Sequence, residues 1–525
     1  MEKETTGVII FKATLLIALI SFLSKLLGLL RDIVIARQFG ASSATDAYLV
    51  ALTAPNLLFF IISGSLAAVI VPVFVDFTAR DQKKEAWKVF NTVFNVSTII
   101  FIVIAVMGML GSSYIVRLVA PFFEKETAVL AAELTRLMFP LLIFAGWASL
   151  FTGLLNANNI FGIPPFSNVV NNLVIILAAL TLGSVYGVQG LAVGTVLAMA
   201  AMALVQVPAL LSAGYRYRPE LQLGHLGVKK VFSLILPAVL AITVNQAYIL
   251  IEKVIASGMP AGSIAALNFA NKLVQFPVSL LVLALGTAVF PTLTKMATHG
   301  ESKELSAIII RLLKLLILGM FPACAGLMVL RYPIVSLLFQ RGAFDRWDTE
   351  LTAVALLFYS VGLAGQAANI ILTKAFYSLQ DTRTPVKITL FTVLVNLGLS
   401  LVLIRYLQHG GLALANSLAS LTGTALFMIY LEKKIEPLEW TCLAKFSLPV
   451  LIASGLMAAA SYFVSIVVSG YLDLSNTFGL AVQVGAAMSA GVAVFAAAAF
   501  IFKIEEFSSL LTLLRGALNG RSYRG

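Results

Sequence analysis

The sequence predicts an all-α, polytopic membrane protein with fourteen transmembrane helices, and three observations predict this class. Of the 525 residues, 60% are hydrophobic and only 11% are charged, whereas soluble domains average roughly 45–50% apolar and about 25% charged residues. The mean hydropathy is +0.98. The apolar residues form runs of about 20 or more, which is the length that a helix needs to cross a bilayer. These runs lack the two-residue alternation of membrane strands.

The first predicted span is preceded by almost no positively charged n-region, and it has no small-residue cleavage site. We therefore interpret it as a retained helix and not as a signal peptide. The later spans follow one another with short breaks, many of them next to glycine or proline. The predicted spans are 8–38, 45–78, 87–111, 127–155, 165–184, 188–213, 229–257, 261–294, 304–330, 348–376, 385–405, 410–431, 445–468 and 477–502.

The lysines and arginines predict the orientation of these spans. If the N-terminus is cytoplasmic, the inner loops and tails hold far more of the 36 Lys and Arg residues than the outer loops do. This is the bias that inserted membrane proteins show, and it places both termini in the cytoplasm. The net charge of +12 then reflects loops that face anionic lipid. It does not indicate a nucleic-acid partner.

An internal repeat predicts how the spans are grouped. A shift of 221 residues places Thr152 on Thr373 and Pro164 on Pro385, and each pair ends one span and enters the next. Six spans separate the copies, which predicts two pseudo-symmetric six-helix lobes and two C-terminal helices. Parallel repeats around a central site are typical of transporters. The end of the chain suggests an amphipathic helix on the cytoplasmic membrane surface. The predicted domains are 1–225, 226–436 and 437–525, the last holding the two extra helices and this tail.

Several charges lie inside predicted spans. A charge at bilayer depth costs at least about 2.5–3.5 kcal/mol on insertion scales, so it usually faces a cavity or a partner. Lys25, Arg31 and Lys272 have no obvious acidic partner except Asp32, which lies on nearly the same helical face as Lys25. An excess of positive charge fits an anionic ligand, most simply a phosphate or diphosphate. The alternative is that these charges are only neutralised locally.

Oxygen-bearing side chains suggest a cation site. Glu252 is an acid within a span, and its carboxylate with nearby amides and hydroxyls offers the oxygen ligands that hard cations prefer. An equally open interpretation is that Glu252 pairs with Lys253 or Arg31. The residues of the predicted sodium site are Glu252, Asn396, Ser400 and Asn416.

The sequence gives no sign of an enzyme. It has no GxxxxGK[ST] loop and no HExxH motif, the usual marks of ATP hydrolysis and of a zinc protease. Its two cysteines and three histidines form neither a disulfide framework nor a metal pattern. We expect no cofactor. Transport would then be driven by a sodium gradient, by the membrane potential or by consumption of the substrate.

Four stretches resemble one known family. "SKLLGLLRDIVIARQFGASSATDAYLVALTAPN", "GSIAALNFANKLVQFP", "LFQRGAF" and "DTRTPVKI" are similar to the lipid II flippases of the MurJ/MviN family. This family is a branch of the multidrug/oligosaccharidyl-lipid/polysaccharide exporter superfamily, and the resemblance runs from about residue 8 to 502. It implies two lobes around a cationic cavity, with a groove for the lipid tail formed by the two extra helices.

The resemblance also implies an activity. Such proteins move the undecaprenyl-diphosphate-linked peptidoglycan precursor, lipid II, from the inner to the outer leaflet of the bacterial cytoplasmic membrane by alternating access. The expected partners are this glycolipid and the surrounding membrane lipids, and we expect a monomer. The substrate-binding residues that it implies are Lys25, Arg31, Asp32, Asp46, Lys272 and Gln275.

Some of these positions depart from the family pattern. Lys25 and Lys272 stand where arginine is usual, which keeps the charge and loses the two-pronged guanidinium. Gln275 replaces a usual glutamate, and Ser400 replaces a carboxylate of a family cation site, whereas Glu252 and Asn396 still fit. These departures leave open a flippase for another polyprenyl-diphosphate-linked oligosaccharide, of the exopolysaccharide or O-antigen type.

Two further classes fit less well. A multidrug antiporter should carry acidic cavity residues to hold cationic drugs, and the charges inside the spans are mainly basic. A membrane enzyme such as a glycan polymerase needs a catalytic acid near the outer face, usually in a large loop. The longest predicted outer loop, about residues 331 to 347, is short and basic.

Overall fold

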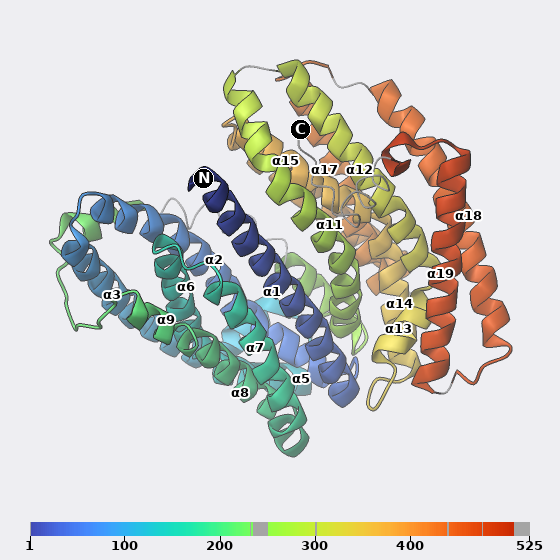
Figure 1. Ribbon diagram of the computed structural model, residues 1–525. Helices are drawn as coiled ribbons and strands as arrows, with labels where there is room; N and C mark the ends of the chain where they lie inside the picture. The colour runs from blue at the N-terminus through green and yellow to red at the C-terminus, as the bar shows by residue number, and fades with distance from the viewer. Residues whose placement is uncertain are drawn as a thin grey trace. The chain divides into compact units, whose positions relative to one another are not determined.

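The computed structural model describes residues 2–231, 233–234, 250–299, 302–437, 440–474 and 476–508, without the side chains of 2–15, 63, 67–68 and 282–291. In these residues every regular element is an α-helix (Figure 1). The helices fall into two compact units. Unit 1 comprises Met1–Ala265 and Arg341–Phe344, and unit 2 comprises Ala266–Gln340 and Asp345–Gly525. Most of the predicted span 229–257, and the surface helix predicted at the end of the chain, lie outside the described residues.

The helix bounds follow the predicted spans closely. In unit 1 they are α1 (Glu2–Phe39), α2 (Ser43–Ala79), α3 (Lys83–Leu110), α4 (Ser112–Val119), α5 (Lys125–Met138), α6 (Leu141–Ala157), α7 (Ile163–Leu180), α8 (Leu182–Leu204) and α9 (Val207–Ser212). The others, of which α11 begins in unit 1, are α11 (Ser263–His299), α12 (Ser302–Val329), α13 (Arg331–Phe339), α14 (Arg346–Val361), α15 (Leu363–Ser378), α16 (Arg383–Leu407), α17 (His409–Glu432), α18 (Trp440–Ser469) and α19 (Thr477–Ile501).

The helices confirm a polytopic membrane protein. Among the described residues, ten helices are long and apolar enough to cross a membrane, or twelve if each of two bent helix pairs is one span. The bent pairs correct the sequence prediction, which had each as one uninterrupted span. The predicted span 127–155 consists of α5 and α6 with a bend of 43°, and 348–376 consists of α14 and α15 with a bend of 48°. The predicted outer loop is also partly helical, because α13 occupies its first half.

A proline stands at one bend and a glycine at the other. Pro140 stands directly before α6, and proline lacks the N–H that would continue the preceding helix. In the second pair Gly362 lies between the two helices. A Cβ there would meet the Cα of Ser417 at 2.5 Å, so the glycine permits α17 to approach the bend closely.

The helix order repeats within the chain. Lys125 and Arg346, where α5 and α14 begin, are 221 residues apart, and the second helices of the two bent pairs begin at Leu141 and Leu363. The long helices α2 and α11 begin at Ser43 and Ser263, with nearly the same separation. The spacing that the sequence matches suggested is therefore also the spacing of the helices, including the bend.

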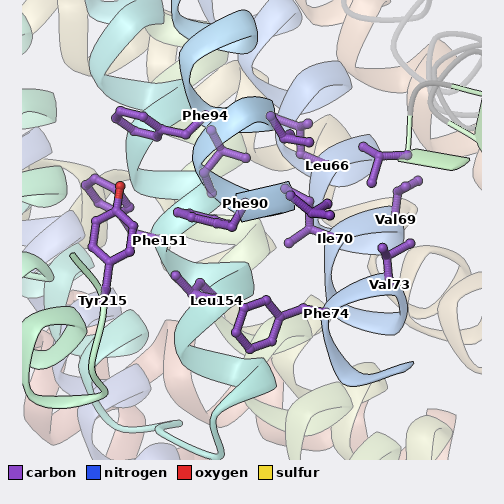
Figure 2. Packing of buried hydrophobic residues seen from close by; sticks show 14 of the residues in the cluster. Leu66, Val69, Ile70, Val73, Phe74, Phe90, Phe94, Phe151, Leu154 and Tyr215 are labelled. Atoms are coloured by element: carbon purple, nitrogen blue, oxygen red, sulfur yellow. The ribbon is translucent and has the colours of Figure 1, made fainter. Parts of the chain in front are cut away.

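Aromatic packing holds unit 1 together. Figure 2 shows Phe90 and Phe94 of α3 facing Phe151 and Leu154 of α6, with aliphatic side chains of α2 on the other side. The rings of Phe94 and Phe151 stack with centroids 5.6 Å apart. Burying a large apolar side chain contributes about 1.5–3 kcal/mol. This core fixes α3 and α6 against each other.

A polar contact closes the turn between α15 and α16 in unit 2. Oδ1 of Asp381 accepts the backbone N–H groups of Arg383 and Thr384, each at 3.0 Å, and the Lys434 ammonium lies 2.8 Å from Oδ2. Burial alone would raise the pKa of the Asp381 carboxyl, but the bonds from Lys434 and Thr384 outweigh it and hold this pKa well below its usual range. Asp381 therefore stays ionised and caps the start of α16.

We expect Asp381→Asn to destabilise the fold at neutral pH by about 1 kcal/mol. This is the upper end of the range for the contribution of an exposed ion pair to stability, and the lysine of this pair is well exposed. The sign follows from the depressed pKa: the carboxylate stabilises the fold above its unfolded pKa of about 3.9, and this contribution is lost as the pH falls toward the folded pKa. The difference between wild type and variant in thermal unfolding should thus shrink from pH 7 to pH 3. A difference that stays constant over this range would contradict the ionic role.

Candidate transport site

Lys25 lines a cavity in unit 1. The cavity has a volume of about 630 Å³ and is lined from α1, α2, α6, α7 and α8. Lys25 is the one charged side chain among the described residues that line it. The rest of the lining is mainly apolar, and it includes six residues with neutral hydrogen-bonding groups. They are Ser21, Ser24, Ser149, Thr152, Asn156 and Asn168.

Helical spacing explains why these groups meet. Ser21 and Lys25 are four residues apart on α1, so both project from the same face. Helix α1 packs against α7, whose first turn lines the cavity with Pro164 and Pro165. The positive end of a helix dipole therefore lies at the same cavity as the lysine. Lysine, helix dipole and neutral donors together make a site that favours an anion with polar substituents.

Arg31 is held in place by its neighbours. Its Nε and Nη2 donate to Oδ1 of Asp32 at 2.9 and 2.8 Å, and its Nη1 donates to Oδ1 of Asn172 at 3.1 Å. Asn172 in turn donates to the backbone carbonyl of Ser24 at 3.0 Å. The side chains of Arg31 and Asp32 are 23% and 7% exposed. Asp32 thus neutralises Arg31 and orients it, and within the described part of unit 1 Lys25 is in no ion pair.

Sequence reasoning missed Asn172. It lies in "SNVVNN", where three asparagines interrupt an apolar run on α7. Repeated amides inside a predicted span were the available signal, because a buried amide is retained only where it finds partners. Its partner on α1 is 141 residues away in the chain, and nothing in the local pattern identifies it.

Asp46 is a buried helix cap. Its Oδ2 accepts the backbone N–H of Gly262 and its Oδ1 that of Ala265, both at 2.7 Å, and the residue is 3% exposed. These N–H groups belong to the start of α11, where a carboxylate is favoured by hydrogen bonds and by the helix dipole. Gly262 has φ +88°, and a Cβ there would lie 1.8 Å from the Ala41 carbonyl oxygen. The sequence predicted Asp46 as a substrate-binding residue. In the structure its carboxylate instead joins α2 to the start of α11.

The predicted residues of unit 2 lie on α11, one turn apart. Lys272 and Gln275 are both exposed. Nε2 of Gln275 donates to Oε1 of Gln366 at 3.1 Å, and Nε2 of Gln366 donates to Oδ1 of Asn416 at 3.3 Å. This chain of amides uses the Gln275 nitrogen as its donor to Gln366. Lys272 and Gln275 therefore offer a cation and a neutral acceptor on neighbouring turns.

The predicted sodium ligands are divided between the two units. Glu252 belongs to unit 1 and the other three to unit 2. Within unit 2, Oγ of Ser400 lies 3.4 Å from Oδ1 of Asn396 on α16, while the Asn416 oxygen on α17 accepts the Gln366 amide. Among the described residues, no group of three or more His, Cys, Asp or Glu side chains is placed to hold a metal ion. The sodium site stays a prediction.

Solved structures with the same fold are membrane transporters. The chain is similar to "Lipid II flippase MurJ, inward closed conformation", with a TM-score of 0.77 and 22% identity over 95% of this chain and 100% of that one. It is also similar to an inward-facing multidrug resistance MATE family transporter of the MOP superfamily, with a TM-score of 0.67 and 15% identity over 82% of this chain and 99% of that one. The fold therefore defines a multi-pass membrane protein of the MurJ/MATE type.

Sequence comparison gives the family within this class. The family model described as "Lipid II flippase MurJ" matches residues 35–482. The lipid II flippase MurJ of Burkholderia cenocepacia is 32% identical over 434 residues, which cover 81% of this chain and 84% of that protein. The chain belongs to the lipid II flippase MurJ family, so the resemblance noted in the sequence is confirmed. It is a transporter and not an enzyme.

Proposed function

We propose that this protein flips lipid II from the inner to the outer leaflet of the bacterial cytoplasmic membrane by alternating access. The family match over residues 35–482 is the observation that supports the substrate. We further propose fourteen spans with both termini cytoplasmic, arranged in a monomer. They form two six-helix lobes, residues 1–225 and 226–436, followed by two helices and an amphipathic tail in 437–525.

In this proposal Lys25 makes the first contact with the diphosphate. The supporting geometry is its position as the one charged residue among the described residues that line a cavity in unit 1. An ammonium that donates to a phosphate oxygen forms a charge-assisted bond, which is about twice as strong as a neutral one. The hydroxyls and amides around it suit the sugar and peptide portion of the headgroup.

We assign the other predicted residues to supporting roles. Lys272 and Gln275 form a second contact point, in unit 2, for a charged oxygen and a donor group of the substrate. Arg31 is a cation of limited reach, because Asp32 and Asn172 hold its guanidinium. Asp32 and Asp46 are then positioning residues, the first for Arg31 and the second for the start of α11.

The proposal is tested with the wild-type chain in a strain depleted of its own lipid II flippase. Expression should restore growth, and purified protein in liposomes should move lipid II to the opposite leaflet. A flippase for exopolysaccharide or O-antigen units would fail in the first assay. In the liposome assay such a flippase would move another polyprenyl-diphosphate-linked oligosaccharide. That result would show that this oligosaccharide, and not lipid II, is the substrate.

We also propose that Glu252, with Asn396, Ser400 and Asn416, binds a sodium ion that resets the carrier. A cation shifts a conformational equilibrium only if its affinity differs between the two states. Glu252→Gln should therefore abolish any sodium dependence of flipping in liposomes while lipid II binding stays within about twofold of wild type. If wild-type flipping is the same with sodium and with choline, the membrane potential or substrate consumption drives the cycle instead.

A further inference from the structure

The short helix α4 stands between two predicted spans and exposes a row of large apolar side chains. One side of the helix is buried and packs against α2, α3 and α5. On the other side, four large apolar side chains are 65–79% exposed. These four residues, which we call the α4 face, are Leu110, Tyr114, Leu118 and Phe122. The first of them ends α3, and the last follows α4.

The helix in the corresponding place of the second repeat is covered. Helix α13 stands before α14 as α4 stands before α5, and it packs against α19, one of the two C-terminal helices. Its most exposed large apolar side chain is Tyr332, at 40%. The exposure of the α4 face is therefore not a property of the repeat itself, and this face requires another cover.

The α4 face continues the exposed apolar surface of α3. Ile99, Val103 and Met107 precede Leu110 at helical spacing on α3, and all three side chains are exposed. Helix α3 is long and apolar enough to cross a membrane, so its exposed apolar side chains contact acyl chains. The α4 face follows directly on a lipid-facing surface, and this continuity identifies lipid as its cover.

The length of α3 places α4 at the membrane boundary. Lys88 is the last charged residue of α3, and Leu110 lies about 33 Å farther along the helix. Measured from Asn95, whose amide donates to backbone carbonyls of a predicted cytoplasmic loop, the distance to Leu110 is about 22 Å. The hydrocarbon core is about 30 Å thick. Helix α3 therefore ends close to the boundary between acyl chains and headgroups, and α4 begins there.

A polar edge lies beside the α4 face. Ser113 and Arg117 are one turn apart on α4 and are exposed, and each precedes a residue of the α4 face by about 100° of helical rotation. A helix in a membrane interface presents such an arrangement, with an apolar side toward the acyl chains and a basic side toward the headgroups. Tyrosine, as at position 114, is enriched at this level.

We propose that α4 lies in the headgroup region of the outer leaflet, with the α4 face against the upper acyl chains and Arg117 at the level of the phosphates. The buried side of α4 would then hold the adjoining ends of α3 and α5 at the membrane surface. This inference is independent of the transported headgroup. The proposed orientation of the chain enters it only in the choice of leaflet.

Fluorescent labels at single cysteines test the depth of α4. Cys324→Ser/Cys442→Ser removes both native cysteines, and Leu118→Cys and Ser113→Cys then attach an environment-sensitive dye to the two edges of α4. Val103→Cys, about 10 Å before Leu110 on α3, is the control in the hydrocarbon core. Glu126→Cys, at an exposed residue of α5, is the control in water.

The purified protein is measured in liposomes without any other protein. Nitroxides near the top of the lipid acyl chains should quench the Leu118→Cys label most strongly, whereas nitroxides on the headgroup should quench the Ser113→Cys label most strongly. The Leu118→Cys label should also emit at a shorter wavelength than the Glu126→Cys label, and aqueous iodide should quench it less.

Two results would overturn the proposal. If iodide quenches the Leu118→Cys label as strongly as the Glu126→Cys label, the α4 face lies in water and is left for a partner protein. If the Leu118→Cys and Ser113→Cys labels are both as deep as the Val103→Cys label, α4 lies inside the hydrocarbon core as part of a span. Neither result would bear on whether the protein flips lipid II.

Discussion

Lys25→Ala should prevent growth of a flippase-depleted strain while the protein stays as abundant in the membrane as wild type. The physical reason is the loss of the ammonium from a cavity whose other described lining groups are neutral. A hydrogen bond to a charged group contributes about 1.5–3 kcal/mol, so lipid II binding should weaken about 10- to 100-fold. Binding of lipid II to the purified variant measures this directly.

Two further variants separate charge from shape at this site. Lys25→Arg should retain growth, because arginine keeps the charge and donates to phosphate at least as well. Ser21→Ala changes the same helix face and the same cavity without removing a charge, and it should weaken binding by less than about tenfold. Normal growth of Lys25→Ala would show that the diphosphate is bound elsewhere. Loss of growth in Lys25→Arg would indicate that the site requires the compact ammonium.

Asp46→Ala should destabilise the folded protein by about 2–6 kcal/mol, since it leaves two buried N–H groups unpaired at roughly 1–3 kcal/mol each. The change removes both acceptors of the Gly262 and Ala265 N–H groups at the start of α11. Membrane abundance and the midpoint of thermal unfolding in detergent measure the loss. Growth of a depleted strain should fail because little folded protein remains.

A matched control comes from another helix cap. Asp345 caps α14 from an exposed position, and removal of such a cap typically costs about 1 kcal/mol. Asp345→Ala should therefore be abundant and nearly as stable as wild type. An Asp46→Ala protein that is abundant, thermally stable and yet unable to bind lipid II would contradict the cap assignment. It would return Asp46 to the substrate site.

The charges in the first span are explained by two different arrangements. Arg31 and Asp32 are adjacent in sequence and form one hydrogen-bonded unit with Asn172, which offsets much of the cost of burying either charge alone. Lys25 is six residues earlier on the same helix and lines a cavity whose other described lining groups are neutral. One charged pair thus stabilises contact between α1 and α7, and one separate cation remains for a ligand.

The sequence by itself determined the membrane class, and it predicted most of the described helices and the spacing at which their order repeats. These features follow from composition and from residues that are neighbours in the chain, because the hydrocarbon core requires a long apolar run wherever the chain crosses it. The family followed as well, since its motifs are contiguous stretches such as "DTRTPVKI". Pro140 was a visible reason for one bend, although the prediction extended the span through it.

Only the tertiary structure decided which partners the polar side chains have. Asn172 meets Arg31 across 141 residues of chain, and Asp46 meets Gly262 across 216. An amide or carboxylate in an apolar run predicts that a partner exists, because an unpaired polar group is costly there. It does not identify that partner, since the choice depends on which helices pack together. For this reason, residues that the sequence grouped as ligands are divided in the structure between a cavity cation, a neutralised pair and a helix cap.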